Sequence, residues 1–215
     1  MSVTSLVRAM LNGLTPPLVL AAYAKIKHRL QTALPAGAMA SYSKLHLACG
    51  KNVIGGWANI DLEGNKNVIA WDLTQPLPVA SNSVEFIYSE HFIEHIGRDQ
   101  AKRLLTECYR VLRPGGVLRI STPDLRKLID EYLAGRVDEW ADLGWQPATP
   151  CRMLNEGMRL WGHQFVYDAD ELRRIFAECG WHDLTFAPWR KSTHPELDGL
   201  ECRPFHNEII VEAVK

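Results

Sequence analysis

One short segment of the 215-residue chain gathers several side chains that can accept a proton or bind a metal ion. It reads Ser89-Glu90-His91-Phe92-Ile93-Glu94-His95. Within it, His91-x-x-Glu94-His95 has the form of an inverted zinc-protease motif, with two imidazoles and a carboxylate one helical turn apart. Histidine is also the side chain best suited to take a proton near neutral pH. The segment therefore allows two kinds of chemistry, general-base catalysis and zinc-dependent hydrolysis.

The element that leads into this segment favours the general base. Residues 84–88 are an apolar run typical of a buried strand, so the segment opens directly from a strand end. A zinc-protease motif lies within a helix instead, and we expect no metal site here. His163 is a further candidate base, although a buried, hydrogen-bonded histidine would explain it somewhat better.

A second stretch, Lys44 to Asp61, has the pattern of a cofactor site. Residues 45–48 predict a buried strand that stops at the small pair Cys49-Gly50. A glycine in such a turn lets backbone N–H groups approach a ligand, and a helix N-terminus just beyond would favour an anionic group. Residues 57–60 predict the next strand, and Asp61 at its tip is placed to accept hydrogen bonds from two ribose hydroxyls.

The spacing around Gly50 excludes two common cofactors. A phosphate-binding P-loop needs a glycine five residues before Gly50-Lys51 and a Ser or Thr after it, but the chain has Leu45 and Asn52 there. A dinucleotide fingerprint needs three closely spaced glycines, whereas Gly50 stands alone. What remains is a cofactor with a ribose and an adenine but no pyrophosphate.

Four segments of the chain, in order, resemble the class I S-adenosylmethionine-dependent methyltransferases. They are residues 45–50, which resemble the family's motif I (Leu-Asp-Leu-Gly-Cys-Gly), and residues 72–78, 84–96 and 112–124. The distance from motif I to the second strand is short, and in this the chain resembles the methyltransferase type 11 branch. That branch is often associated with surface-polysaccharide genes. The chain departs from motif I at His46, which replaces an acid, at Ala48 and Asn52, which replace glycines, and in a shortened following helix.

The resemblance implies an α/β fold, a Rossmann-like seven-stranded mostly parallel sheet with N-terminal helices and a helical insertion after strand 5. It implies S-adenosyl-L-methionine as the cofactor, with Asp72 and the backbone of Leu73 at the adenine, although a simple turn would also explain Asp72. The implied candidate bases are His91 first, then His95 and His163. The implied cofactor-binding residues are Leu47, Ala48, Cys49, Gly50, Lys51, Asn52, Asp61, Leu62, Asp72, Leu73, Ser89, Glu90 and His91.

The remaining elements follow from periodicity and turn residues. We expect strands at 68–71 and 117–121, and a hairpin of strands at 183–189 and 207–214. Helices are expected at 99–112, ended by a turn at 113–116, and at 168–179. An insertion at 135–165 would lie over the reactive edge as an acceptor pocket or lid, and so would the connection 190–206, with His194 and His206.

The N-terminal segment, residues 1–40, differs in composition from the expected methyltransferase domain, residues 41–215. Six basic residues and no acidic residue precede Asp61, although the net charge of the chain is −1. Two helical stripes within residues 1–34 predict either a cap that packs on the domain or a peripheral contact with a protein or an anionic membrane. Ala22-Tyr23-Ala24 mimics a signal-peptidase site, but Pro16 and Pro17 break the apolar run before it.

Five cysteines with no Cys-x-x-Cys pair indicate reduced thiols in a cytoplasmic protein, with peripheral attachment at the inner membrane face as the alternative. The sequence does not indicate a surface of basic and aromatic residues of the kind that binds nucleic acid. We therefore expect no nucleic-acid partner. The sequence thus predicts O- or N-methylation of a small-molecule or saccharide acceptor. A non-catalytic cofactor- or partner-binding module of the same fold, and a zinc hydrolase, stay open as alternatives.

Overall fold

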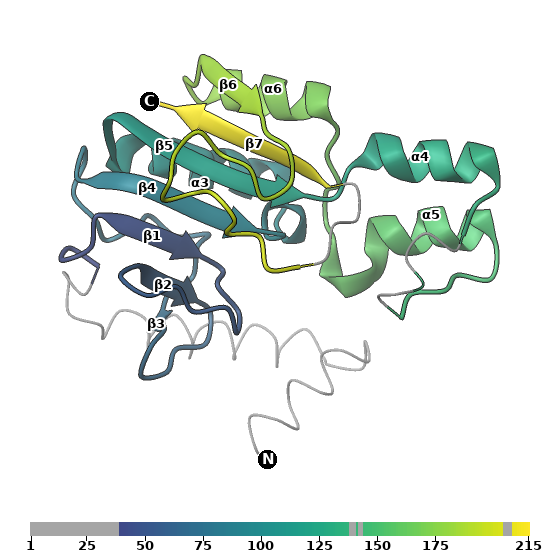
Figure 1. Cartoon of the computed structure of the whole chain (residues 1–215), viewed down its shortest axis with the longest axis horizontal. Coiled ribbons are helices and arrows are strands. Elements are labelled where there is room, and N and C mark those ends of the chain that lie inside the picture. The colour runs from purple at the N-terminus through teal and green to yellow at the C-terminus, as the bar shows by residue number, and fades with distance from the viewer. Residues whose placement is uncertain (1–38, 138–140, 142–143, 204–207) are drawn as a thin grey trace. The chain divides into compact units, whose positions relative to one another are not determined.

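The computed structural model describes residues 39–137, 141, 144–203 and 208–215. Seven strands in this part form one sheet in the order β3-β2-β1-β4-β5-β7-β6 (Figure 1). Strands β1 to β5 pair with one another in parallel, and β7 is antiparallel to both β5 and β6. The predicted fold class is therefore confirmed. The N-terminal helices expected within residues 1–34 lie outside the described residues.

The strands arise where the sequence has short, mostly apolar runs, which a sheet covered on both faces buries. Their bounds are Lys44–Leu47 (β1), Ala58–Asp61 (β2), Ile69–Ala70 (β3), Val84–Glu90 (β4), Leu112–Thr122 (β5), Asp183–Phe186 (β6) and Ile209–Val214 (β7). The order of the strands reverses between β1 and β4. In open α/β sheets, ligands bind at the carboxyl ends of the strands beside such a reversal.

The turn expected at residues 113–116 is part of β5. The register with β4 shifts there. Leu112 pairs with Val84, whereas Val117, five residues on, pairs with Phe86, only two residues on. Gly115 takes a left-handed φ of 77°, its N–H donates to the Lys215 carbonyl, and Lys215 donates to Gly116. The backbone groups of the expected turn thus find partners at the end of β7, and the strand starts earlier than the sequence indicates.

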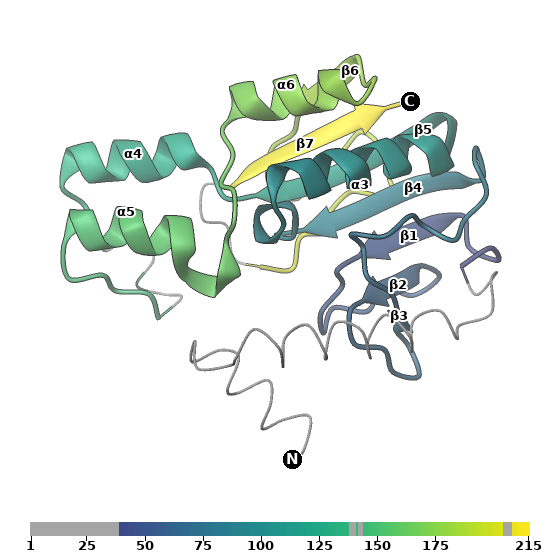
Figure 2. The same cartoon turned by 180° about the vertical axis from the view of Figure 1, so that it is seen from behind.

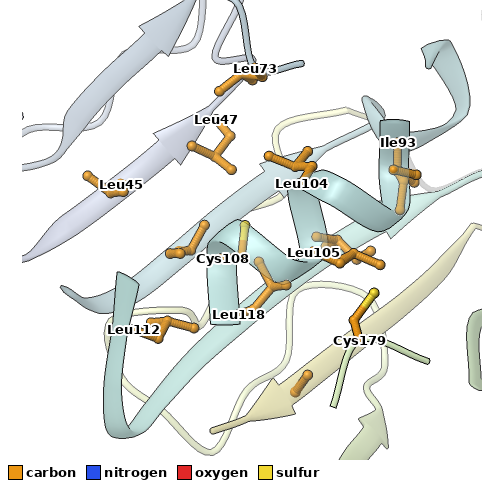
Figure 3. Close-up of a cluster of buried hydrophobic side chains, with 14 of the residues drawn as sticks. Leu45, Leu47, Leu73, Ile93, Leu104, Leu105, Cys108, Leu112, Leu118 and Cys179 are labelled. Carbon is orange, nitrogen blue, oxygen red and sulfur yellow. The ribbon is translucent and has the colours of Figure 1, made fainter. Parts of the chain in front are cut away.

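Helices α3 (Arg98–Val111) and α6 (Ala169–Glu178) lie on one face of the sheet (Figure 2). The buried residues of α3 follow the helical period, and they are Ala101, Leu104, Leu105, Cys108 and Val111. In Figure 3, Leu104, Leu105 and Cys108 lie among Leu45 and Leu47 of β1 and Leu118 of β5. As predicted, α6 begins after Asp168, whose carboxylate accepts from the Glu171 N–H, and ends before the left-handed Gly180.

The opposite face of the sheet is covered by the connection from residue 187 to 203, which crosses in front of β4 and β5 in Figure 1. Leu197 of this connection packs with Trp57, Tyr88 and Val117. The expectation that the whole connection overhangs the strand ends is wrong. His194 packs against the ring of Phe86, which pairs with the first residue of β1, far from the strand tips, while His206 lies outside the described residues.

A buried ion cluster, formed by Arg119, Glu201 and Glu212, joins this connection to the sheet. Arg119 on β5 is fully buried; its Nε donates to Glu201 at 2.6 Å and its Nη1 donates to Glu212 at 2.6 Å. The same Nη1 also donates to the backbone carbonyl of Lys191 at 3.0 Å. The connection is thus fixed to the face of the sheet by charge as well as by apolar contact.

After strand 5 comes a hairpin of α4 (Leu125–Ala134) and α5 (Pro150–Arg159), of which only α5 lies within the insertion expected at residues 135–165. The two helices lie side by side beyond the carboxyl end of β5 in both views (Figures 1 and 2). Leu128 and Met153 form their shared core. Short 3-10 turns at Ile93–His95 and Leu160–Gly162 complete this end of the molecule. Within the described residues, no helix has both the length and the apolar character needed to cross a membrane.

Candidate functional site

A cavity of about 340 Å³ opens at the strand reversal between β1 and β4. Its walls come from the turn after β1, from the tip of β4 and from the end of the 187–203 connection. The lining residues are His46, Ala48, Cys49, Gly50, Lys51, Asn52, Glu90, Cys202 and Arg203. Six of these were predicted as cofactor-binding residues, whereas His46, Cys202 and Arg203 were not.

The turn after β1 holds two residues in the left-handed region. Ala48 has a φ of 52° and Gly50 a φ of 55°. A Cβ on Gly50 would meet nothing within 4 Å, so glycine is favoured there by its backbone conformation and not by a steric contact. Asn52 closes the turn by donating its N–H to the Cys49 carbonyl, and it does so without a positive φ, so the glycine usual at this position is not needed.

The helix expected after Gly50 is absent, since residues 48–57 are all described and contain only turns. The side chain of Asn59 explains this difference. It binds the N–H and the carbonyl of Ile54 and the carbonyl of Trp57, so it fixes this loop in a non-helical path. The cavity therefore has turn N–H groups at this edge but no helix N-terminus.

Asp61 reaches the turn from the tip of β2, as predicted. Its Oδ2 accepts from the Gly50 N–H at 2.8 Å and its Oδ1 accepts from the Leu62 N–H at 2.6 Å. Each carboxylate oxygen has a second lone pair, so both can still accept a ligand hydroxyl. These bonds orient the carboxylate beside the cavity, which fits a ribose-bearing cofactor.

Glu90 ties the far wall of the cavity together. This buried carboxylate, at the tip of β4, accepts from the backbone N–H of Cys202 at 3.1 Å and of Arg203 at 3.0 Å. The Cys202 thiol lies 2.9 Å from the same carboxylate. No local motif marks Cys202 or Arg203, and the only sequence signal for them is the length of the connection that carries them.

His46 and the two cavity cysteines are uncharged. Burial lowers the pKa of His46, whose Nδ1 lies 3.2 Å from Asn59 Oδ1, so a neutral ring stands where the family has an acid. Burial raises the pKa of Cys49 to about 11, with Asp61 adding to it. Burial and then Glu90 raise the pKa of Cys202 to about 11. Both thiols are therefore protonated near neutral pH and are poor nucleophiles.

Asp72 and Leu73 lie outside this cavity. Asp72 Oδ1 accepts from the N–H and the hydroxyl of Thr74, so the aspartate forms the simple turn that the sequence left open. Leu73 is buried in the core and, with residues 74–76, borders a second cavity of about 470 Å³ along α3. Of the other predicted cofactor residues, Leu47 and Ser89 are buried partners on adjacent strands, and Leu62 is exposed.

All three candidate bases gather around one buried carboxylate, that of Glu94. Its Oε1 lies 3.3 Å from His91 Nδ1 and 3.8 Å from His95 Nε2, and its Oε2 accepts from the Thr122 hydroxyl at 3.0 Å. His163 contacts His95, with ring centroids 4.9 Å apart. The sequence placed these residues in one site without predicting that Glu94 would be at its centre.

The backbone explains how His163 reaches a segment some 70 residues away. Gln164 and Phe165 donate their N–H groups to the Glu94 carbonyl, and the Gln164 side chain donates to the His95 carbonyl. His91, at the start of this segment, has a left-handed φ of 49°. As expected, the motif lies on a strand end and a single 3-10 turn, so the helix of a zinc-protease motif is not formed.

Burial controls the protonation states within this cluster. It opposes ionisation of Glu94, but His91, with smaller contributions from the backbone and from His95, outweighs burial and holds the pKa of Glu94 below its usual range. Burial also lowers the pKa of His95, which the Glu94 charge offsets only in part. The carboxylate is therefore ionised near neutral pH, and the ring of His95 is neutral.

Comparison with known proteins gives a family match and structural neighbours. Residues 47–120 match the family described as “Methyltransferase domain”. Residues 47–120 are therefore similar to a methyltransferase domain. This finding confirms the resemblance noted in the sequence and supports S-adenosylmethionine as its cofactor.

One curated relative, from Mycolicibacterium smegmatis, is named “Probable S-adenosylmethionine-dependent methyltransferase” and is 48% identical over 48 residues. That match spans 22% of this chain and only 18% of the relative. A structure of an S-adenosylmethionine-dependent methyltransferase from Mesorhizobium loti is 17% identical, covers 87% of this chain and 96% of that one, and has a TM-score of 0.50. A second, from Archaeoglobus fulgidus, is 16% identical, covers 89% and 94%, and has a TM-score of 0.47. The likeness to the Mesorhizobium protein bears on the fold alone.

Proposed function

We propose that this methyltransferase domain transfers a methyl group from S-adenosylmethionine to an oxygen or nitrogen of a small-molecule or glycan-type acceptor. The observation that carries the proposal is the hydrogen bond between Gly50 and Asp61 at the strand reversal. It places an oriented carboxylate beside a left-handed turn that borders a cavity, which suits the ribose of this cofactor.

S-adenosylmethionine would supply a methyl group on a sulfonium, which is already a good leaving group. The chain therefore needs chiefly to hold the acceptor in line with the methyl carbon and to exclude water. Asp61 would accept from the ribose hydroxyls, and the turn from Ala48 to Asn52 would border the rest of the cofactor. Asp72 and the backbone of Leu73 lie outside the cavity but follow β3 at the same edge of the sheet, so they are proposed to meet the adenine there, while Asp72 also holds its turn through Thr74.

We assign His91 as the general base. Its Nδ1 faces Glu94, which leaves Nε2 to accept the acceptor proton while the acceptor atom attacks the methyl carbon. A buried carboxylate behind an imidazole stabilises the imidazolium that forms, as in catalytic triads. His91 also follows Glu90, which lines the cavity. His95 and His163 are the alternatives within the same cluster.

The first test is calorimetric titration with S-adenosylmethionine. We expect micromolar binding to the wild type and at least a tenfold loss in Asp61→Ala, because hydrogen bonds to a charged group contribute about 1.5–3 kcal/mol each. Asp170→Ala, at an exposed position on α6, is the matched control and should bind as the wild type does. Binding that survives Asp61→Ala would refute the ribose role. A wild type that does not bind would favour a partner-binding module instead.

The base is tested separately from the cofactor site. With labelled cofactor and a panel of sugars, nucleotide sugars and small amines, His91→Gln should lower methyl transfer by about a hundredfold or more. The Kd for S-adenosylmethionine should stay within a few-fold, because His91, although the resemblance counted it among the cofactor-binding residues, does not line the cavity. A glycan-type acceptor rests on the branch resemblance alone, so transfer only to amines would overturn that part of the proposal.

Residues 1–34, which lie outside the described part of the chain, are proposed to contact a protein or the cytoplasmic membrane surface. The support is their charge, because no acidic residue precedes Asp61. The membrane contact would be supported if the full chain sediments with anionic vesicles. A variant with Lys25, Lys27 and Arg29 changed to Gln should then no longer sediment with them. Equal sedimentation of both proteins would refute it.

A further inference from the structure

We propose that Glu94, His95 and His163 bind one divalent transition-metal ion, with zinc as the ion that best suits them. Each residue offers one ligand atom, and the three atoms all lie within 4.8 Å of one another. The proposal does not depend on methyl transfer. It also differs from the zinc-protease motif of the sequence, because His163 comes from a distant segment and His91 is not one of the three ligands.

The spacing is close to that of a loaded site. Glu94 Oε1 and His95 Nε2 are 3.8 Å apart. Nitrogen and oxygen ligands lie about 2.0–2.2 Å from zinc, so two of them in a tetrahedral arrangement are separated by about 3.5 Å. His163 would move slightly inward, together with the exposed 3-10 turn Leu160–Gly162 that precedes it.

The state of Glu94 is an observation independent of this spacing. The side chain is fully buried, and Oε2 is bound by Thr122. Among the described residues, Oε1 has no hydrogen bond of good geometry, although His91 Nδ1 lies 3.3 Å away. A buried carboxylate oxygen without such a partner is costly, and a cation at this position would remove that cost.

The orientation of His163 is that of a metal ligand. Its Nδ1 lies 2.9 Å from the Gly157 carbonyl, and a carbonyl oxygen can only accept, so Nδ1 carries the hydrogen and Nε2 has the free lone pair. Metal-ligating histidines nearly always donate their other N–H to such an outer partner. Gly157 is buried on α5, where a Cβ would lie 2.9 Å from the Leu128 side chain, so the helical hairpin fixes this carbonyl.

The ligand set also indicates which ion would bind. Two imidazoles and one carboxylate suit zinc and similar transition metals, whereas magnesium and calcium prefer oxygen ligands alone. Three protein ligands would leave a coordination position open, which is typical of catalytic zinc sites. Both segments that carry the cluster include a bulky residue in the left-handed region, His91 with φ 49° and Trp161 with φ 59°. Such strain is concentrated at functional sites.

The test is a titration of the full chain, freed of metal with a chelator, with Zn²⁺ by calorimetry and with Co²⁺ by visible absorption. We expect one equivalent of Zn²⁺ to bind with micromolar or tighter Kd, and Co²⁺ to give the intense bands of a four-coordinate site. His163→Ala and Glu94→Gln should each weaken binding by at least tenfold. His182→Ala, which removes an exposed histidine away from the cluster, should bind as the wild type does.

The outcomes separate cleanly. Absence of stoichiometric binding, or binding unchanged in His163→Ala, would overturn the proposal. Loss of binding in Cys151→Ser, with His163→Ala unaffected, would also overturn it, because an exposed thiol would then hold the ion. If Glu94→Gln fails to fold by circular dichroism, His163→Ala at its half-buried position decides the question. Cofactor and acceptor are absent from the titration, so a failure here says nothing against the proposed function.

Discussion

Replacing Arg119 by methionine should destabilise the protein strongly. Arg119 donates to Glu201, to Glu212 and to the Lys191 carbonyl, and all three charged side chains are at most 7% exposed. Methionine fills a similar volume but leaves two buried carboxylates without their cation. Removing one partner from a buried ion pair costs about 3–5 kcal/mol, because the remaining charge is uncompensated.

The assay is equilibrium unfolding in urea. With an m-value of about 2 kcal/mol per molar urea, that loss would lower the midpoint by about 1.5–2.5 M. The deficit should shrink as the pH falls, since an unpaired buried carboxylate has a raised pKa and is stabilised by taking up a proton. Changing all three residues together to Met, Gln and Gln should recover most of the lost free energy, because no unpaired charge then remains.

A surface pair supplies the control for this experiment. Arg126→Met breaks a pair with Asp130 in which the arginine side chain is 74% exposed, and it should change the free energy of unfolding by less than about 0.5 kcal/mol. A cost of less than about 1 kcal/mol for Arg119→Met, or a triple variant no more stable than the single one, would contradict a buried, mutually compensating cluster. Either result would mean that the cluster is solvated in the folded protein.

Three further predictions concern the cofactor cavity and the cysteines. Gly50→Ala should lower the free energy of unfolding by about 1 kcal/mol in urea, because its φ of 55° is unfavourable for alanine while the space is open. Burial lowers the pKa of His46 below 6.5, so the unfolded state binds more protons than the folded state. The free energy of unfolding should therefore decrease as the pH falls below 6.5, by at most about 1.4 kcal/mol per pH unit. With a thiol reagent near pH 7, exposed Cys151 should react first, because burial raises the pKa of Cys49 and of Cys202 to about 11.

Each of these has a matched control. Gly116→Ala should cost more than Gly50→Ala, because a Cβ there would lie 2.9 Å from the Arg113 carbonyl. His46→Asn should make the loss of stability with falling pH shallower, and His182→Ala should leave it unchanged. Cys151→Ser should abolish the fast thiol phase, and a fast phase that persists would contradict the assignment.

Much of the sheet could be predicted because its signals are local. Continuous apolar runs specify the buried parallel strands, and Asp168 and Gly180 mark the two ends of α6 with a cap and a left-handed residue. The position of Asp61 was also predicted correctly, because it follows directly from the predicted strand. A residue at the tip of a parallel strand must lie at the same edge as the other strand tips, whatever surrounds it.

The features that the sequence did not reveal depend on contacts between distant segments. Asn59 prevents a helix after Gly50 by bonding to Ile54 and Trp57, and no pattern in residues 50–57 shows this. Cys202 reaches Glu90 over 112 positions, and Arg119 reaches Glu201 over 82. Such pairs are joined only once the sheet has formed, so neither partner carries a local signal of the other.

The position of β7 has a consequence for the synthesis of the chain. β7 follows β6 in the sequence, yet it lies between β5 and β6. β6 therefore has no partner strand on the ribosome until residues 209–214 have emerged, and its backbone groups stay open to pairing with another chain during that time. We expect nascent chains stopped before β7 to be held by chaperones, whereas the five parallel strands can already pair among themselves.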